Sequence, residues 1–178
     1  MIKRLLLLPL ILWLAGCASQ YSISEQQVQQ YLNDKVVKQV KLDSDGMKIQ
    51  SGITRLDVKL GEQPERISVT AFGELKIDTP LFPLYASMQA KFNAKPRYQA
   101  SNHGLYLDDL QLEDVSLTPE KLQTLIGPVA RQMANQAKSL LQQQPIYVLN
   151  SDKPKEATIA EMTQSIKVEP GKLTLLFK

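Results

Sequence analysis

The chain has 178 residues, of which 21 are Lys or Arg and 18 are Asp or Glu, with a single cysteine and a single histidine. One cysteine excludes an intramolecular disulfide. Setting aside residues 1–16, which contain Lys3 and Arg4, leaves 19 basic against 18 acidic residues and lowers the formal net charge from +3 to +1. A near-neutral chain without a polybasic patch gives no electrostatic basis for binding nucleic acid or anionic lipid headgroups.

The first 16 residues have the layout of a secretory signal. Two positive charges lie within 1–4, an apolar run follows over 5–14, and Ala15 and Gly16 are small. The apolar run is about half the length that a membrane-spanning helix needs. The sequence therefore predicts a removable signal over 1–16 and no permanent transmembrane anchor.

Leu14-Ala15-Gly16-Cys17 resembles the lipobox of bacterial lipoproteins. The resemblance implies that Cys17 becomes the diacylglyceryl-modified first residue, carrying acyl chains such as palmitate. The alternative is an ordinary signal peptide with a cysteine near its end. A catalytic thiol is disfavoured because this segment is removed or acylated. Ala18, which follows the cysteine, indicates sorting to the outer membrane by the same resemblance.

The 162 residues from Cys17 onward suit one domain. We expect a short tether over 17–23 and a single α+β domain over 24–178. Six residues lie between Cys17 and Ser24, a reach of about 20 Å when extended. The domain is therefore expected to stay beside the membrane.

Two periodicities divide this domain. Ser24 followed by Gln27 fits a capping box, and the apolar spacing predicts a helix over about 24–37. From Gln39 to Leu117 the period is two, which predicts strands at 40–42, 47–49, 55–60, 67–77, 84–94 and 105–117. Turns are expected at Asp45-Gly46 and over 61–65.

One predicted strand has an inward row in which large and small residues alternate: Leu84, Ala86, Met88, Ala90, Phe92 and Ala94. Three alanines on a buried face leave space that something must fill, because interiors pack densely. An opposing helix or a bound apolar ligand would fill it, and the residues alone favour the helix.

The apolar period slips twice in the strand over 105–117. Each slip coincides with an acidic pair, Asp108-Asp109 and Glu113-Asp114. A one-residue insertion is what a β-bulge produces, so we expect two bulges and a strongly curved strand.

Thr118 as N-cap and Pro119 in the first turn predict the start of a long helix ending near Gln143. A strand at 146–149, a short helix at 158–165 and a hairpin turning at Pro170-Gly171 are expected beyond it. Burying the sheet and the helix stripe together predicts an α+β fold, in which a long curved antiparallel sheet wraps around one long helix.

No residue has an expected catalytic role, and no cofactor or metal is expected. His103 lies in an expected turn without a nucleophile motif. The segment 43–46 begins like a calcium loop but lacks the closing glutamate. The acidic residues at 108, 109, 113 and 114 could hold a hard cation, although a solvated sheet face is the commoner explanation. We predict a protein that is not an enzyme.

Over essentially the whole mature chain the sequence resembles the YceB-like family of bacterial lipoproteins. The resemblance rests on the lipobox and, in order, on "YSISEQQVQQYL", "VSLTPEKLQTL", "QQQPIYVL" and "IKVEPGKLTL". The family has no established biochemical activity. It is related in fold to the tubular lipid-binding superfamily, whose domains wrap a curved sheet around a long helix and hold lipid between them.

That relation implies a groove for an apolar ligand between the sheet and the helix. No family motif marks its lining, so we select inward apolar positions: Leu84, Met88, Phe92, Leu125, Val129 and Met133. The same residues would suit a plain core. We expect a periplasmic lipoprotein, anchored to the outer membrane by its acylated N-terminus, that binds lipid, fatty acid or another apolar molecule. The alternative is a non-enzymatic envelope protein with a dry core and a structural or protein-interaction role.

Overall fold

A computed structural model describes residues 20–37, 41–43, 49–78 and 80–177. Over these residues the larger antiparallel sheet has the strand order β2 (Lys41–Asp43), β3 (Ile49–Leu60), β4 (Ile67–Ile77), β5 (Leu84–Gln99), β6 (Gly104–Thr118) and β7 (Tyr147–Val148). A smaller antiparallel sheet has the order β1 (Gln20–Ser24), β9 (Lys172–Phe177) and β8 (Thr163–Glu169). The helices are α1 (Glu25–Lys35), α2 (Gln123–Gln143) and α3 (Pro154–Met162). The predicted α+β class is confirmed.

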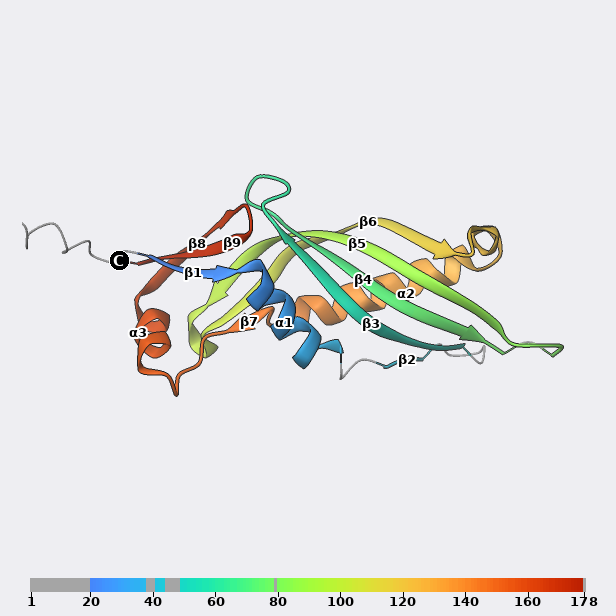
Figure 1. Ribbon diagram of the computed structural model, residues 1–178, viewed down its shortest axis with the longest axis horizontal. Coiled ribbons are helices and arrows are strands. Elements are labelled where there is room, and N and C mark those ends of the chain that lie inside the picture. Colours follow the sequence, from blue (N-terminus) through green and yellow to red (C-terminus); the bar gives the residue numbers. More distant parts are fainter. Residues whose placement is uncertain (1–19, 38–40, 44–48, 79, 178) are drawn as a thin grey trace, which may run out of the picture.

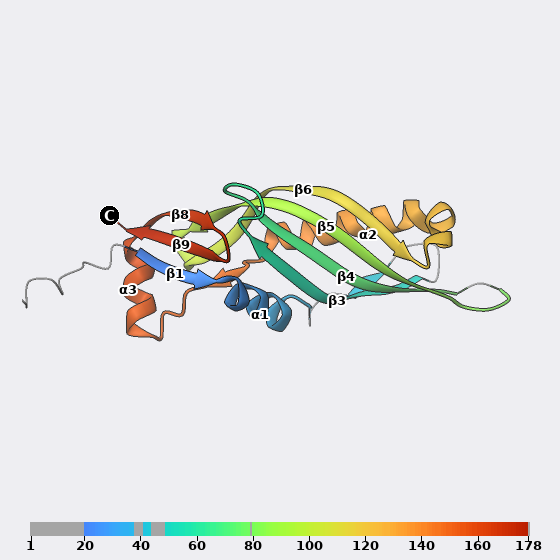
Figure 2. The same ribbon diagram turned by 45° about the horizontal axis from the view of Figure 1, so that its top comes forward.

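The molecule is elongated, and its two ends are built differently. The larger sheet curves over α2, which contacts β6 far more than β5 (Figure 1). The smaller sheet and α3 lie at one end, which we call the proximal end (Figures 1 and 2). The connection between β4 and β5 forms the opposite end, which we call the distal end. No helix among the described residues is long and apolar enough to cross a membrane.

Strand β4 follows the predicted alternation. Its predicted inward row is buried from end to end and consists of Ile67, Val69, Ala71, Gly73, Leu75 and Ile77. The paired row on β5 is also buried from Ala86 to Ala94. Alternate side chains point to opposite faces of a strand, so a single face of both strands forms the core.

Both predicted bulges are confirmed. The register between β5 and β6 shifts between Lys91 and Phe92, so that no β5 residue lies opposite Glu113 in the ladder, and it shifts again between Asn93 and Lys95. At the second shift Asp109 has a φ of 49°, in the left-handed region. Asp tolerates that region better than most residues, and bulges bend the strand that carries them. The acidic pairs thus mark where β6 curves over α2.

The N-terminal helix begins as predicted. Ser24 accepts a hydrogen bond from the Gln27 backbone N–H, and the Gln27 side chain accepts one from the Ser24 N–H. The helix ends at Lys35, two residues before the predicted boundary. It lies against β3 and buries Val28 and Leu32.

Three expectations about element boundaries are wrong. Gln20–Ser24 form β1, which overlaps the tether predicted over 17–23, because these residues pair with β9. Thr118 is the last residue of β6 rather than a helix N-cap, and a 3-10 turn over Glu120–Leu122 precedes α2. The third helix begins at Pro154, earlier than predicted, and Thr163 onward pairs with β9. The predicted turn at 45–46 lies outside the described residues.

Candidate lipid-binding surfaces

The six predicted groove residues lie on the expected elements but do not form one lining. Leu84, Met88, Val129 and Met133 belong to one apolar cluster near the distal end, where β4, β5 and β6 meet α2. Phe92 is fully buried in the larger cluster that extends to the proximal end. Leu125 does not face the sheet: 67% of it is exposed, so its placement in the groove is wrong.

The space that the alanines of β5 leave is filled by protein in this structure. Ala90 and Ala94 are fully buried, and Met133 of α2 is 1% exposed within the cluster that contains Ala86 and Met88. Small residues on the strand therefore allow close packing beneath the curved sheet. Half-buried Leu84 and Val129 lie at the border of this sheet–helix interface.

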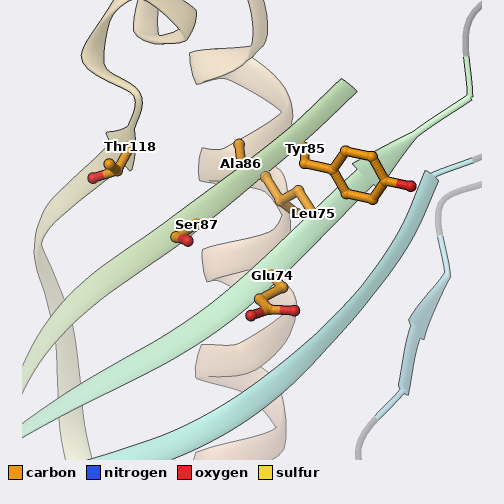
Figure 3. Close-up of a pocket in the computed structure, with 6 residues that line it drawn as sticks. All are labelled: Glu74, Leu75, Tyr85, Ala86, Ser87 and Thr118. Atoms are coloured by element: carbon orange, nitrogen blue, oxygen red, sulfur yellow. The ribbon is translucent and has the colours of Figure 1, made fainter. Parts of the chain in front are cut away.

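A distal pocket of about 230 Å³ lies on the other side of the sheet, as Figure 3 shows with α2 behind the strands. Its lining consists of Glu74, Leu75, Tyr85, Ala86, Ser87 and Thr118. Leu75 and Ala86 are buried, whereas the polar members and Tyr85 are exposed. A polar, shallow lining on the solvated face suits water better than a lipid chain. None of the six predicted groove residues lines it.

A proximal pocket has the opposite character. It measures about 390 Å³ and is lined by Gln20 and Tyr21 of β1, by Lys155, Thr158, Ile159 and Met162 of α3, and by Phe177 of β9. Met162 is 42% exposed. The Lys155 Nζ lies 5.7 Å from the centre of the Tyr21 ring. An apolar concavity of this size with one cation at its rim is typical of small-ligand sites.

A network around Glu156 fixes α3 beside the proximal pocket. The buried Glu156 carboxylate accepts hydrogen bonds from the Asn150 N–H at 2.8 Å and from the Lys153 Nζ at 3.0 Å. Burial alone would raise the pKa of Glu156, but these two donors and the Lys153 charge hold it below its ordinary value. Burial also raises the pKa of the nearby Tyr147 to about 12, with a contribution from Glu156. Near neutral pH, Glu156 therefore stays charged and Tyr147 stays neutral.

The acidic residues at the β6 bulges pair with cations of the protein. Asp108 pairs with Arg97 at 3.0 Å and Asp109 with Arg66 at 3.3 Å. Glu113 lies 3.7 Å from the Nζ of Lys91. Hydrogen bonds from Gln111 and Arg66 lower the pKa of Asp109. Over the described part of the chain, no three His, Cys, Asp or Glu side chains gather as a metal site would require.

His103 lies at the end of the 3-10 turn between β5 and β6, with a φ of 56°. Its Nδ1 lies 3.1 Å from the Ser151 Oγ. This contact joins the β5–β6 turn to the loop before α3. His103 thus lies in a turn, as predicted.

Sequence reasoning missed the proximal pocket, because the pocket depends on a strand where a tether was predicted. Tyr21 and Ile23 alternate with polar residues, which was the available strand signal. The remaining lining comes from residues more than 130 positions later in the chain. Only the pairing of β1 with β9 brings these segments together.

The fold and these surfaces define an α+β protein with a sheet-on-helix core and an apolar pocket at its proximal end. Residues 23–172 match the family described as protein of unknown function, DUF1439, and the chain belongs to that family. The uncharacterized lipoprotein YceB of Salmonella typhimurium is 28% identical over 169 residues, covering 92% of this chain and 91% of the relative. The protein of that name from Escherichia coli is 27% identical over 172 residues, with the same coverage.

The predicted resemblance to YceB-like lipoproteins is therefore confirmed, and it relates the chain to lipoproteins of the cell envelope. Among solved structures, a crystal structure of lipopolysaccharide binding protein aligns with a TM-score of 0.38 and 10% identity. That alignment covers 90% of this chain and 40% of the other chain.

Proposed function

We propose that this protein is a non-catalytic lipoprotein, acylated at Cys17 and held at the periplasmic face of the outer membrane, that binds a lipid or another apolar molecule. The signal-like segment and the sequence Leu14-Ala15-Gly16-Cys17 support the anchor. The lipoprotein relatives, which match over 92% of the chain, support it further. Ala18 favours the outer membrane by resemblance to sorted lipoproteins.

The observation that carries the ligand proposal is the partly exposed border of the apolar cluster between the sheet and α2. Leu84 of β5 and Val129 of α2 are half-buried at this border, and Met88 and Met133 are buried in the same cluster. Methionine side chains are flexible and fill irregular space, so they adapt to an inserted chain more easily than branched residues do. A ligand would reach the interface at this border and displace the two methionines.

A second candidate function rests on the tight packing of the same interface. Phe92 is fully buried and Met133 is 1% exposed, so the core is filled without a ligand. A dry core suits an envelope protein that acts through protein partners. In that case the sheet and α2 form a scaffold.

Binding to the interface is tested with the full-length chain carrying ¹³C-methyl methionine, purified in detergent and titrated with oleate. We expect the Met88 and Met133 methyl resonances to shift together. Val129→Glu places a charge at the border and should weaken the shift at least tenfold, whereas Leu125→Glu, at an exposed position of the same helix, should not. Thermal unfolding of both variants verifies that they fold.

Native mass spectrometry of the purified protein gives a second measurement. Co-purified lipid at a fixed stoichiometry supports binding. An empty protein whose Met88 and Met133 resonances do not respond to oleate or phospholipid would favour the scaffold function. The anchor is tested separately by membrane fractionation of the full chain, because Cys17→Ser should abolish the acyl mass and the outer-membrane location.

A further inference from the structure

The proximal pocket differs chemically from the sheet–helix interface. Its walls are the Tyr21 and Phe177 rings and the Ile159 and Met162 side chains, and it is open to solvent beside the exposed Met162. Exposed apolar concavities on a protein surface commonly mark interaction or ligand sites. The volume of about 390 Å³ lies within the range of small-molecule pockets, and the narrow apolar lining suits a hydrocarbon chain.

The pocket adjoins the point where the chain leads to Cys17. Gln20 is both the first residue of β1 and part of the pocket lining. Three consecutive Cα–Cα steps separate Cys17 from Gln20, and they span at most about 11 Å. An acyl chain attached to Cys17 therefore starts close to the pocket wall, whatever path the connecting residues take.

We propose that the proximal pocket holds one acyl chain of the lipid attached to the protein's own Cys17. The inference rests on the proposed acylation of Cys17, and it adds a site that is separate from the interface between the larger sheet and α2. The occupant is the chain's own modification rather than a free lipid, because a short covalent linker gives it an effective concentration in the millimolar range or above.

The free energy of transfer favours moving the acyl chain from the membrane or micelle into the pocket. Moving a hydrocarbon chain from a bilayer or micelle into another apolar environment changes its own solvation little. The chain would also remove the exposed parts of Met162 and the neighbouring apolar walls from water, which is favourable. Lys155 at the rim would face the polar head of the lipid. The other acyl chain of the diacylglyceryl group would stay in the bilayer and keep the proximal end beside the membrane.

The test places a photoreactive side chain in the pocket of the full-length, processed protein. Met162→benzoylphenylalanine introduces a benzophenone, which inserts into nearby C–H bonds on irradiation, in membranes and in detergent. Trypsin then releases residues 156–167, with the probe, and residues 17–35, with the acylated cysteine. Mass spectrometry identifies what has become joined. Thr158→benzoylphenylalanine is a second probe in the same lining, and Leu125→benzoylphenylalanine on α2 is the matched exposed control.

From both pocket probes we expect 156–167 joined to 17–35 at the acyl chain, which fragmentation of the joined peptides distinguishes from joining at Gln20 or Tyr21 in the same lining. This product should be at least fivefold more abundant than the product of the Leu125 control, in which 122–131 carries the probe. Addition of a phospholipid mass to 156–167 would overturn the inference in favour of a bilayer lipid. Equal joining from the Leu125 control would also overturn it, as would joining at Gln20 or Tyr21 alone, or no joining, while 17–35 carries its acyl mass. A 17–35 peptide without acyl mass would refute the proposed anchor itself, which distinguishes the two failures.

Discussion

The side-chain amide of Asn33 hydrogen bonds to both main-chain groups of Leu56. Its Oδ1 accepts from the Leu56 N–H at 2.9 Å, and its Nδ2 donates to the Leu56 carbonyl at 2.7 Å. Asn33 lies on α1 and Leu56 on β3, so this side chain pairs with the strand as a neighbouring strand would. Strand β2 pairs with β3 only at residues 50–52. Beyond them, Asn33 satisfies the main-chain N–H and carbonyl of Leu56 at the edge of the sheet.

Two further side chains of α1 extend this pairing. Gln29 accepts from the Val58 N–H at 3.4 Å, and Glu25 accepts from the Leu60 N–H at 2.9 Å. Four residues of helix rise about 6 Å, close to two residues of strand at about 6.7 Å. The i, i+4, i+8 spacing of these residues on the helix therefore matches alternate residues of the strand, and α1 covers the strand edge.

Asn33→Ala should lower the free energy of unfolding by about 1–3 kcal/mol, because it leaves a partly buried N–H and carbonyl without partners. Urea denaturation of the full chain measures this loss. Asn135→Ala, at an exposed position of α2, should change stability by less than about 0.5 kcal/mol. Equal effects of the two changes would show that Asn33 does not cover the strand edge.

Met133→Ala should be strongly destabilising, by about 2–5 kcal/mol, because it opens a cavity in the cluster beneath β5. Leu125→Ala should change stability little, since most of that side chain is already exposed. Denaturant unfolding of both variants gives the comparison. A small loss for Met133→Ala would indicate that the interface is loosely packed and able to open.

Two neighbouring substitutions test the left-handed backbone of Asp109 at the second β6 bulge. Asp108→Val and Asp109→Val each remove one ion pair with an arginine, and Asp109→Val also removes the exposed hydrogen bond from Gln111. Only Asp109 has a positive φ, where a β-branched residue is strained by about 1–2 kcal/mol. Asp109→Val should therefore be less stable than Asp108→Val by about that amount in urea unfolding. Equal stabilities would mean that the bulge shifts without cost.

Acidification should destabilise the protein, with Glu156 as one cause. Its pKa in the folded state lies below the ordinary value, so its contribution is present above the unfolded pKa and is lost as pH falls through the folded pKa. We expect the free energy of unfolding to fall from about pH 5 downward, and to fall less steeply for Glu156→Gln.

Unfolding in urea at several pH values between 7 and 3 measures this dependence. Glu161→Gln, at an exposed position on the same helix, serves as control and should follow the unmodified protein. Hydrogen bonds from Thr174, Lys172 and Lys167 lower the pKa of Glu169 to about 2, so its contribution should decline as pH falls below the unfolded pKa and be fully lost only below the folded pKa. An unchanged slope for Glu156→Gln would contradict the assigned role of Glu156.

Local patterns predicted much of this architecture correctly. The capping box at Ser24 and Gln27, the alternating rows of β4 and β5 and the two slips in β6 all depend on neighbouring residues. Such features are readable because a capping bond spans three residues and strand faces repeat every second residue. The same patterns predicted the sheet-on-helix class, since both apolar faces had to be buried together.

The prediction of the candidate site was less successful, for a physical reason. Leu125 and Met133 both fit the apolar stripe of α2, but a helix stripe does not show how far the opposing sheet extends over it. Ile126, in the same first turn of α2, is buried against the sheet, whereas Leu125 is 67% exposed and remains in water. The crossing of the helix and the sheet decides which apolar residues become core.

The sequence by itself determined the relation of this protein to lipoproteins and its local elements, namely the strands and the long helix. Tertiary structure alone decided that Gln20 and Tyr21 meet Met162 and Phe177 in one pocket. These residues are joined by long-range strand pairing, which leaves no periodic signal linking the two segments. The same pairing brings an apolar pocket within three residues of the predicted acylation site.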